Sequence, residues 1–245
     1  MKNYDRELQN RVAFLKRTLE ESGAKGFVFG NSGGKDSALA GILCKMACDN
    51  TVGVMMPVST RNFDEDTRDG LEVAEKFHIE TRTVVLKEAN ATLAAAIGMA
   101  TQINDLSLAN IAPRLRMTTL YTIAGSEGRL VVGTGNRSEA YMGYFTKWGD
   151  GAYDVNPIAD LTVTEIYEFL RHLGAPDAII NKAPSAALYD GQTDESEMGV
   201  TYAAIDHFLA TGEANSHDRA IIERMHKNSR HKRRMPLVYN DEELI

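Results

Sequence analysis

The apolar residues of the chain follow two spacings, one typical of amphipathic helices and one typical of buried strands. At residues 5–22, Leu8, Val12, Leu15 and Leu19 recur every three or four positions, which predicts a helix. Four short apolar or β-branched runs predict strands at residues 26–30, 51–56, 80–86 and 129–132. Further helices are expected at residues 38–47, 62–77, 89–101, 106–124, 162–173, 201–210 and 218–228.

The order of these elements predicts the fold class. Strands that alternate with helices form parallel sheets whose two faces are covered by the helices. We therefore expect an α/β protein with an open, doubly wound, Rossmann-like parallel sheet. Residues 134–157, rich in Gly, Asn, Asp and aromatic residues, and the polar residues 181–198 show no clear periodicity. We expect a functional loop in the first stretch and a mobile lid in the second.

Composition and charge narrow the class of protein. The 245 residues are 43% hydrophobic and 25% charged, which is ordinary for a globular protein, and the net charge of −7 disfavours a broad nucleic-acid-binding surface. The longest mainly apolar run, residues 91–100, is too short to span a membrane. Cys44 and Cys48 are four residues apart on a predicted helix, where a disulfide has poor geometry. These features favour two small buried thiols and a reducing cytoplasm.

The most distinctive segment follows the first predicted strand: Gly30 to Ser37 reads Gly-Asn-Ser-Gly-Gly-Lys-Asp-Ser. A glycine turn between a strand and a helix directs backbone N–H groups and the positive end of the helix to one point, which suits a phosphate. Ser32 and Ser37 add hydroxyl donors, whereas the carboxylate of Asp36 would repel a phosphate unless a divalent cation lay between them. The segment therefore predicts a site for a polyphosphate together with Mg²⁺.

This turn differs from the common P-loop, in which Gly-Lys is followed by Ser or Thr and a further glycine stands five residues before that Gly. Here Asp36 follows Lys35, and Phe29 occupies the earlier glycine position. The pattern Ser-Gly-Gly-x-Asp-Ser instead resembles the PP-loop of the ATP pyrophosphatase superfamily. Those enzymes cleave ATP between the α and β phosphates and hold the departing pyrophosphate in this loop. A strand-to-helix turn that binds no ligand is the alternative.

A second loop, residues 133–136, follows the fourth predicted strand and reads Gly-Thr-Gly-Asn, with Glu139 shortly after it. Ligands of open parallel sheets bind beyond the carboxyl ends of the strands, so both loops are expected at one site. Asp36 and Glu139 are therefore the predicted Mg²⁺ ligands, with phosphate oxygens and waters completing the octahedron. Without the glycine loop, Glu139 would be interpreted as a solvated surface carboxylate.

Further motifs extend the resemblance over almost the whole chain. In order they are residues 110–117 (Asn-Ile-Ala-Pro-Arg-Leu-Arg-Met), 133–136 with Glu139, 146–151 (Thr-Lys-Trp-Gly-Asp-Gly), 154–157 (Asp-Val-Asn-Pro), 184–186 (Pro-Ser-Ala), 192–195 (Gln-Thr-Asp-Glu) and 231–233 (His-Lys-Arg). The ordered set resembles the ammonia-dependent NAD synthetases, whose fold is adenine nucleotide alpha-hydrolase-like. In that family the carboxylate of nicotinic acid adenine dinucleotide (deamido-NAD) attacks the α-phosphate of ATP and pyrophosphate leaves. Ammonia then displaces AMP from the acyl-adenylate to give NAD.

The resemblance implies roles for individual residues. The residues expected to bind ATP are the glycine loop and two later positions: Gly30, Asn31, Ser32, Gly33, Gly34, Lys35, Asp36, Ser37, Thr134 and Ser185. Mg²⁺ would be bound by Asp36 and Glu139. The residues expected to bind the dinucleotide are Arg114, Lys147, Asp154, His231 and Lys232. The catalytic residues would be Asp36, Asp150 and Asp154, the last two being candidates for binding ammonium and taking its proton.

The chain departs from the family pattern at several positions. Most relatives carry Lys where Val163 stands and Asp where Ala187 stands, and Asn31 replaces an apolar residue of the loop. Lys35 occupies the variable position of the loop. It is expected to supply a cation near the phosphates in place of the one missing at position 163.

The resemblance further implies a homodimer. It also implies a single synthetase domain over residues 1–245 with no glutaminase domain, so that ammonia is free or comes from a separate protein.

The residues by themselves leave two other functions open. One is another PP-loop adenylating enzyme, such as a tRNA thiolase or an amidotransferase synthetase half, against which the net charge of −7 weighs. The other is a non-catalytic nucleotide-binding relative, against which the complete pair of Asp36 and Glu139 weighs.

Overall fold

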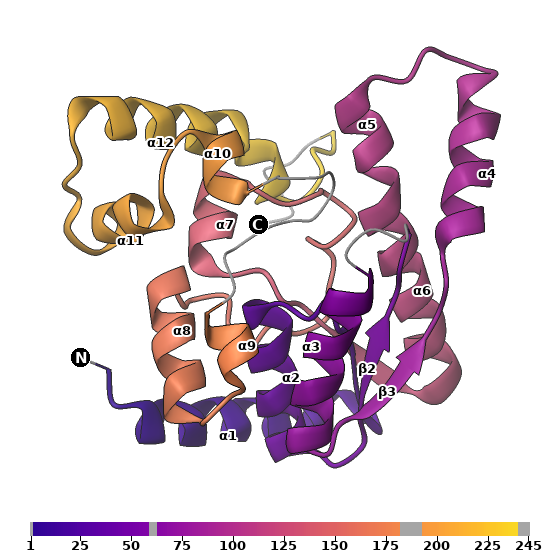
Figure 1. Ribbon diagram of the computed structural model, residues 1–245, viewed down its shortest axis with the longest axis vertical. Coiled ribbons are helices and arrows are strands. Elements are labelled where there is room, and N and C mark those ends of the chain that lie inside the picture. The colour runs from indigo at the N-terminus through magenta and orange to yellow at the C-terminus, as the bar shows by residue number, and fades with distance from the viewer. Residues whose placement is uncertain (1, 59–62, 182–192, 240–245) are drawn as a thin grey trace.

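Four parallel strands form the centre of the molecule. The computed structural model describes residues 2–58, 63–181 and 193–239. The strands β1 (Gly26–Gly30), β2 (Thr51–Met55), β3 (Glu80–Thr83) and β4 (Arg129–Val132) form one sheet in the order β3-β2-β1-β4. All neighbouring pairs are parallel, and Figure 1 shows β2 and β3 side by side. β1 therefore lies between β2 and β4, and the loops that follow β1 and β4 leave the sheet side by side.

Helices surround this sheet. They are α1 (Tyr4–Ser22), α2 (Lys35–Ala47), α3 (Phe63–Lys76), α4 (Lys87–Gly98), α5 (Asp105–Ala109), α6 (Ile111–Glu127), α7 (Arg137–Met142), α8 (Val163–His172), α9 (Asp177–Ile180), α10 (Asp194–Met198), α11 (Tyr202–Thr211), α12 (Ser216–Asn228) and the short 3-10 helix η1 (Arg230–Lys232).

Alternate side chains of β1 enter different cores, which confirms that helices cover both faces of the sheet. Phe27 and Phe29 pack with the buried residues of α1, α2 and α8, whereas Val28 packs with Leu120 and Ala124 of α6. This is the two-residue alternation of a strand that is buried on both sides. The predicted class, an α/β protein with an open, doubly wound parallel sheet, is confirmed.

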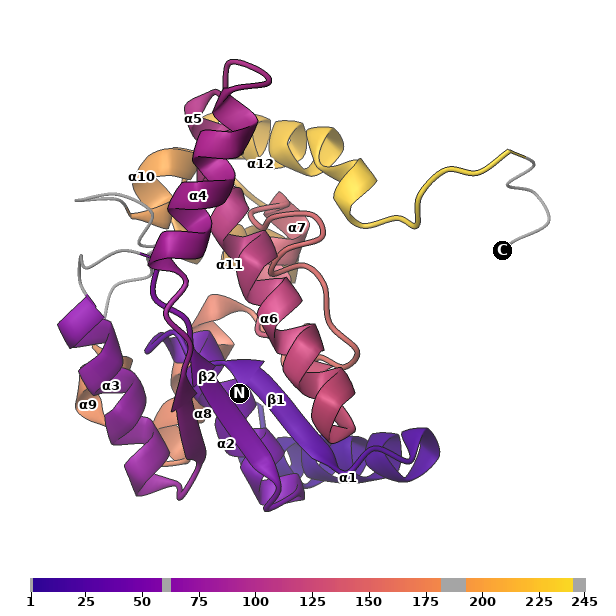
Figure 2. The same cartoon turned by 90° about the vertical axis from the view of Figure 1, so that its right-hand side faces the viewer.

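A third apolar cluster joins the carboxyl-terminal helices beyond the carboxyl ends of the strands. Met142 of α7, Val163 of α8, Met198 of α10, Tyr202 of α11 and Ile222 of α12 are all buried in it. Figure 1 shows α7, α10, α11 and α12 above the level of α2, with α8 below them, and Figure 2 shows α12 leading into an extended tail. α8 packs against both α11 and α2, and the ring of Tyr202 in α11 lies 5.7 Å from Nζ of Lys35, the first residue of α2.

The structure corrects several predicted boundaries. The third strand ends at Thr83, not at residue 86, and the helix predicted over residues 106–124 is two helices, α5 and α6. Pro113 lies in the first turn of α6, where its missing N–H leaves no hydrogen bond unmade. The stretch 134–157 contains α7, and the stretch 181–198 contains α10. Within the described residues, no helix is long and apolar enough to cross a membrane.

Candidate active site

The glycine loop joins the end of β1 to the first turn of α2. Gly33 has a φ of +71°, a conformation that costs a residue with a Cβ about 1 kcal/mol or more. Gly34 is the N-cap of α2, and no side chain caps the helix there. The first backbone N–H groups of α2 therefore stay available to an anion, and the helix dipole favours negative charge at this point.

Two serines hold the loop in a fixed shape. The Oγ atoms of Ser32 and Ser37 lie 3.1 Å apart, and the N–H of Gly34 donates to Oγ of Ser32 at 3.3 Å. Ser37 Oγ donates to the carbonyl of Gly34 at 3.0 Å. The loop is thus pre-organised by its own hydroxyl groups, which reduces the entropy lost when a ligand orders it.

Asn31 fastens the loop to a neighbouring helix. Its Nδ2 donates to the carbonyl of Gly70 in α3 at 3.1 Å, and its Oδ1 accepts from the N–H of Gly33 at 3.3 Å. The side chain is buried, and a Cβ at Gly70 would lie 2.9 Å from Oδ1 of Asn31. The polar residue that departs from the family pattern therefore has a structural contact of its own.

The second loop carries Asn136, which connects both predicted metal ligands. Asn136 is fully buried and is the N-cap of α7: its Oδ1 accepts from the N–H of Glu139 at 2.9 Å, and Oε2 of Glu139 accepts from the N–H of Asn136 at 3.0 Å. The Nδ2 of Asn136 donates to Oδ1 of Asp36 at 3.2 Å. Asp36 and Glu139 are thereby brought to one place, as the sequence predicts.

The carboxylates of Asp36 and Glu139 fit a hard divalent cation. Burial, reinforced by the charge of Asp36, raises the pKa of Glu139 to about 8. Two carboxylates whose charges repel each other favour a cation between them. In the described part of the chain no group of three or more acidic, histidine or cysteine side chains is placed to hold a metal. The remaining ligands of a Mg²⁺ ion would therefore come from phosphate oxygens and water, as is usual for Mg²⁺ at nucleotide sites.

Lys35 places an ammonium group next to this pair. Its side chain is 6% exposed, and Nζ lies 2.7 Å from Oδ2 of Asp36. Burial alone would lower the pKa of Lys35, but the charges of Asp36 and Glu139 outweigh burial, and the pKa is raised. The rings of Tyr167 and Tyr202 lie 5.9 and 5.7 Å from Nζ. Lys35 is therefore charged and enclosed by α8 and α11.

The loop of residues 143–157 lies beside the second loop and is held by several polar contacts. Oδ1 of Asp150 accepts from the N–H of Thr146 at 2.8 Å, and Oγ1 of Thr146 donates to Oδ1 of Asn110 at 2.6 Å. The protein around the Asp150 carboxyl raises its pKa by burial, although the residue keeps an exposed edge. Trp148 is half exposed with a φ of +60°, which is rare for a bulky residue and often marks a functional loop.

Of the residues predicted to bind the dinucleotide, Lys147 lies in this loop, and Arg114 and Lys232 contact it. Nη2 of Arg114 donates to the carbonyl of Lys147 at 3.4 Å, and Nζ of Lys147 lies over the ring of Trp148 at 5.4 Å. Nζ of Lys232 donates to the carbonyls of Gly143 and Phe145 at 2.8 and 2.6 Å. In this structure Lys232 therefore anchors the loop.

Asp154 and His231 are placed differently. Asp154 accepts from the N–H of Val131 at 2.8 Å and from the hydroxyl of Tyr121 at 3.1 Å, so that both of its oxygens fasten residues 154–155 to the edge of β4. His231 lies exposed in η1. Thr134 follows β4 in the second loop, whereas Ser185 and Ala187 lie outside the described residues.

Sequence reasoning missed Asn136, Tyr167, Tyr202 and Asp194 as members of the site. The hydroxyl of Tyr202 donates to Oδ2 of the buried Asp194 at 3.0 Å, and both residues lie near Lys35 and Glu139. The spacing Asn-x-x-Glu at residues 136–139 is a helix N-cap signal that could have predicted the start of α7. No local signal indicates that the aromatic residues of α8 and α11 meet the start of α2.

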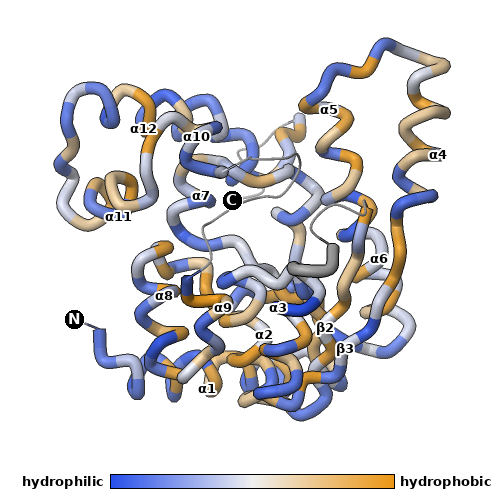
Figure 3. Tube along the Cα trace, in the orientation of Figure 1, coloured by the Kyte–Doolittle hydropathy of each residue, from blue (hydrophilic) through white to orange (hydrophobic). Residues whose placement is uncertain are grey.

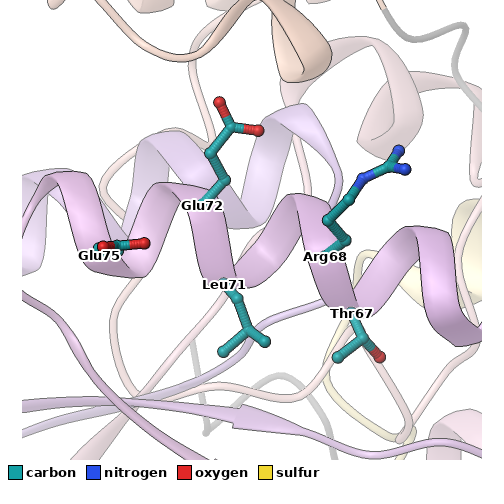
Figure 4. A pocket seen from close by; sticks show the side chains of 5 residues that line it. All are labelled: Thr67, Arg68, Leu71, Glu72 and Glu75. Atoms are coloured by element: carbon teal, nitrogen blue, oxygen red, sulfur yellow. The ribbon is translucent and has the colours of Figure 1, made fainter.

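A separate surface hollow lies on α3, away from this group. Thr67, Arg68, Leu71, Glu72 and Glu75 line it, and Figure 4 shows that all five come from the same helix. Since a helix face alone does not converge polar groups on one point, the hollow is a poor candidate for catalysis. The glycine loop with its two carboxylates remains the candidate active site.

Comparisons with known proteins agree with this geometry. The sequence profile of the NAD synthase family matches residues 7–236. An NH(3)-dependent NAD(+) synthetase of Carboxydothermus hydrogenoformans is 45% identical over 96% of this chain and 98% of its own length. The structure of the NMN synthetase from Francisella tularensis superposes with a TM-score of 0.93 at 38% identity, over 98% of this chain and 100% of that one. The NH3-dependent NAD synthetase of Campylobacter jejuni superposes with a TM-score of 0.80 at 27% identity, over 98% of this chain and 100% of that one.

The fold and the site thus define an α/β nucleotide-binding protein with a PP-loop and a carboxylate pair at the ends of two adjacent parallel strands. Within that class, the chain belongs to the NAD synthase family.

Proposed function

We propose that this protein is an ATP-dependent ligase that amidates nicotinic acid adenine dinucleotide with ammonia to give NAD, AMP and pyrophosphate. The observation that carries the proposal is the meeting of Asp36, Glu139 and the open N-terminus of α2 through Asn136. Its relatives, which include NH(3)-dependent NAD(+) synthetases, support it. The other PP-loop activities find no support among these relatives.

The glycine loop performs the first half of this reaction. A carboxylate oxygen of the substrate attacks the α-phosphate of ATP, and the bond to the β-phosphate breaks as pyrophosphate leaves. The N–H groups of α2 and the hydroxyls of Ser32 and Ser37 bind the departing pyrophosphate. Asp36 and Glu139 would hold Mg²⁺, which supplies positive charge to the phosphate oxygens as negative charge develops there.

The loop of residues 143–157 performs the second half. Ammonia attacks the acyl carbon of the adenylate, AMP leaves, and the nitrogen loses a proton. We propose that Asp150 binds ammonium and accepts its proton, which its raised pKa supports because a raised pKa makes it a stronger base than an ordinary carboxylate. Arg114, Lys147 and Lys232 are cations suited to a substrate that carries a pyrophosphate, and the exposed ring of His231 can donate a hydrogen bond to it. We also propose Asp154 as a substrate contact, because the residue is exposed.

A mononucleotide substrate is the second candidate. The likeness to the Francisella NMN synthetase favours it, since NMN arises by the same amidation from the mononucleotide of nicotinic acid. The two substrates share the reacting carboxylate, so the glycine loop and the carboxylate pair serve both. They differ in the adenosine half, and contacts to that half decide between them.

Product analysis separates the two candidates. The purified protein is incubated with ATP, Mg²⁺ and ¹⁵N-ammonium chloride, with either the dinucleotide or the mononucleotide, and the labelled amide is quantified. A kcat/KM at least tenfold higher for the dinucleotide supports the first proposal, and the reverse ratio supports the second. No labelled amide from either substrate would contradict both.

We also propose a homodimer, assembled through the projecting arm of α4 and α5. Figure 1 shows the arm standing away from the sheet, and Figure 3 shows apolar residues along it. Leu93, Ile97, Met99, Leu106 and Leu108 are exposed there, which is unusual for a monomer in solution. We further propose one synthetase domain that uses ammonia, either free or from a separate protein. We also propose a reducing cytoplasm, which suits the unpaired thiols of Cys44 and Cys48.

A further inference from the structure

The ammonium group of Lys35 lies inside the candidate metal site instead of in solvent. The side chain starts from the first residue of α2, where the helix dipole disfavours a cation. Burying an ammonium group also costs several kcal/mol unless it is paired. The contact of 2.7 Å with Oδ2 of Asp36 and the faces of two tyrosine rings offset these costs. A neutral side chain would avoid the cost of desolvation, but it would leave the charges of Asp36 and Glu139 uncompensated. The buried ammonium group is therefore tied to the two carboxylates, which calls for a functional reason.

This contact competes with a metal ion for the same carboxylate. Oδ1 of Asp36 accepts from Asn136, and Oδ2 accepts from Lys35, so both oxygens already have hydrogen-bond donors. A divalent cation bound to Asp36 would lie within a few ångströms of the Lys35 ammonium group. Like charges at such a distance repel strongly in a buried site. The metal and the ammonium group therefore cannot both keep their closest approach to Asp36.

We propose that Lys35 is a resident cation of the carboxylate pair, which keeps divalent metal weakly bound until a nucleoside triphosphate arrives. The ammonium group then leaves Asp36 for a phosphate oxygen, and the metal takes its place between Asp36 and Glu139. The flexible four-carbon stem of lysine permits this movement, and its compact charge suits a phosphate. The inference rests on the proposed role of Asp36 and Glu139 as metal ligands. It assigns to Lys35 the coupling of metal binding to nucleotide binding.

Metal titration tests the inference without turnover. Mn²⁺, which shares the oxygen preference of Mg²⁺, is titrated by electron paramagnetic resonance with and without an ATP analogue that carries a methylene group between the α and β phosphates. The variants are K35M, which keeps the length of the stem without the charge, and K35R, which keeps the charge. Without nucleotide, K35M should bind Mn²⁺ about tenfold or more tightly than the wild type, as removal of a neighbouring like charge implies. K35R should resemble the wild type, and the analogue should strengthen Mn²⁺ binding less in K35M than in the wild type.

Equal or weaker Mn²⁺ binding by K35M without nucleotide would overturn the inference. Thermal unfolding provides a second measurement: in EDTA the midpoint of K35M should fall below that of the wild type, and Mn²⁺ should raise it by more. The variant D36N distinguishes an error in the proposed metal pair from an error in the proposed role of Lys35. If D36N binds Mn²⁺ normally with the analogue, Asp36 is not a metal ligand, and the proposed role of Lys35 is wrong as well. If D36N loses binding while K35M matches the wild type, only the role of Lys35 is wrong.

Discussion

Asn136 and Asp36 are 100 residues apart in sequence and are joined by a hydrogen bond of 3.2 Å between Nδ2 and Oδ1. The same asparagine caps α7 and holds Glu139 through its backbone N–H. One buried side chain therefore fixes the relative position of both proposed metal ligands. Outer contacts of this kind orient the residues that bind a metal and tune their affinity.

The first prediction concerns this asparagine. N136S keeps a good N-cap for α7 but is too short to reach Asp36. Mn²⁺ affinity in the presence of an ATP analogue should fall roughly 10- to 100-fold, while far-ultraviolet circular dichroism stays unchanged. N104S is the matched control, because Asn104 caps α5 in the same way away from the site. Equal metal affinity in N136S and N104S would show that Asn136 does not position Asp36.

The second prediction concerns ammonia. Desolvation by the protein around its carboxyl raises the pKa of Asp150, although the residue is exposed, so Asp150 should lose its charge at a higher pH than an ordinary carboxyl. We expect the wild-type kcat/KM for ammonia to fall as the pH drops through this raised pKa. D150N should raise the KM for ammonia about tenfold or more and remove that acidic limb. A pH–rate profile and an ammonia KM that match the wild type would exclude Asp150 from ammonia handling.

The third prediction concerns stability and pH. Nη1 and Nη2 of the buried Arg11 donate to Oδ1 and Oδ2 of Asp160 at 2.6 and 2.8 Å. Burial alone would raise the pKa of Asp160, but the hydrogen bonds from Arg11 outweigh it and the pKa is lowered. The stabilisation is therefore present above the ordinary aspartate pKa of about 4 and is lost as the pH falls through the lowered value.

D160N should accordingly cost about 1 kcal/mol at pH 7, a modest figure because Asp160 is partly exposed. The difference from the wild type should shrink as the pH falls below about 4. Urea unfolding at a series of pH values measures it. The control is E223Q, which removes an exposed pair with Arg219 and should change little at any pH. A D160N deficit that is constant down to pH 2 would contradict the assignment.

The fourth prediction concerns assembly. Leu106 lies on the projecting arm and is 69% exposed, so L106E should weaken the proposed dimer through an unpaired buried charge. Sedimentation velocity should show the wild type as a dimer and L106E shifted to monomer at low micromolar concentration. L71E is the control, since Leu71 is an exposed leucine in the hollow on α3. A wild-type monomer, or the same shift in L71E, would refute an interface at the arm.

The sequence predicted the sheet and the glycine loop because their signals are local. The apolar run at residues 26–30 and the glycines after it specify a strand and a turn whatever lies elsewhere. The short helices α7 and α10 were missed because six or five residues give too little periodicity to detect. The position of Lys35 between Tyr167 and Tyr202 depends on how α8 and α11 pack onto α2, which no spacing along the chain encodes.

We propose that the glycine loop activates a nicotinate carboxylate by transferring AMP to it. ATP–pyrophosphate exchange without ammonia measures that half-reaction directly. We predict exchange of labelled pyrophosphate into ATP only when nicotinic acid adenine dinucleotide is present, with a loss of at least 100-fold in D36N. Exchange that proceeds without a nicotinate substrate, or that is absent with the dinucleotide although ATP binds, would contradict the claim.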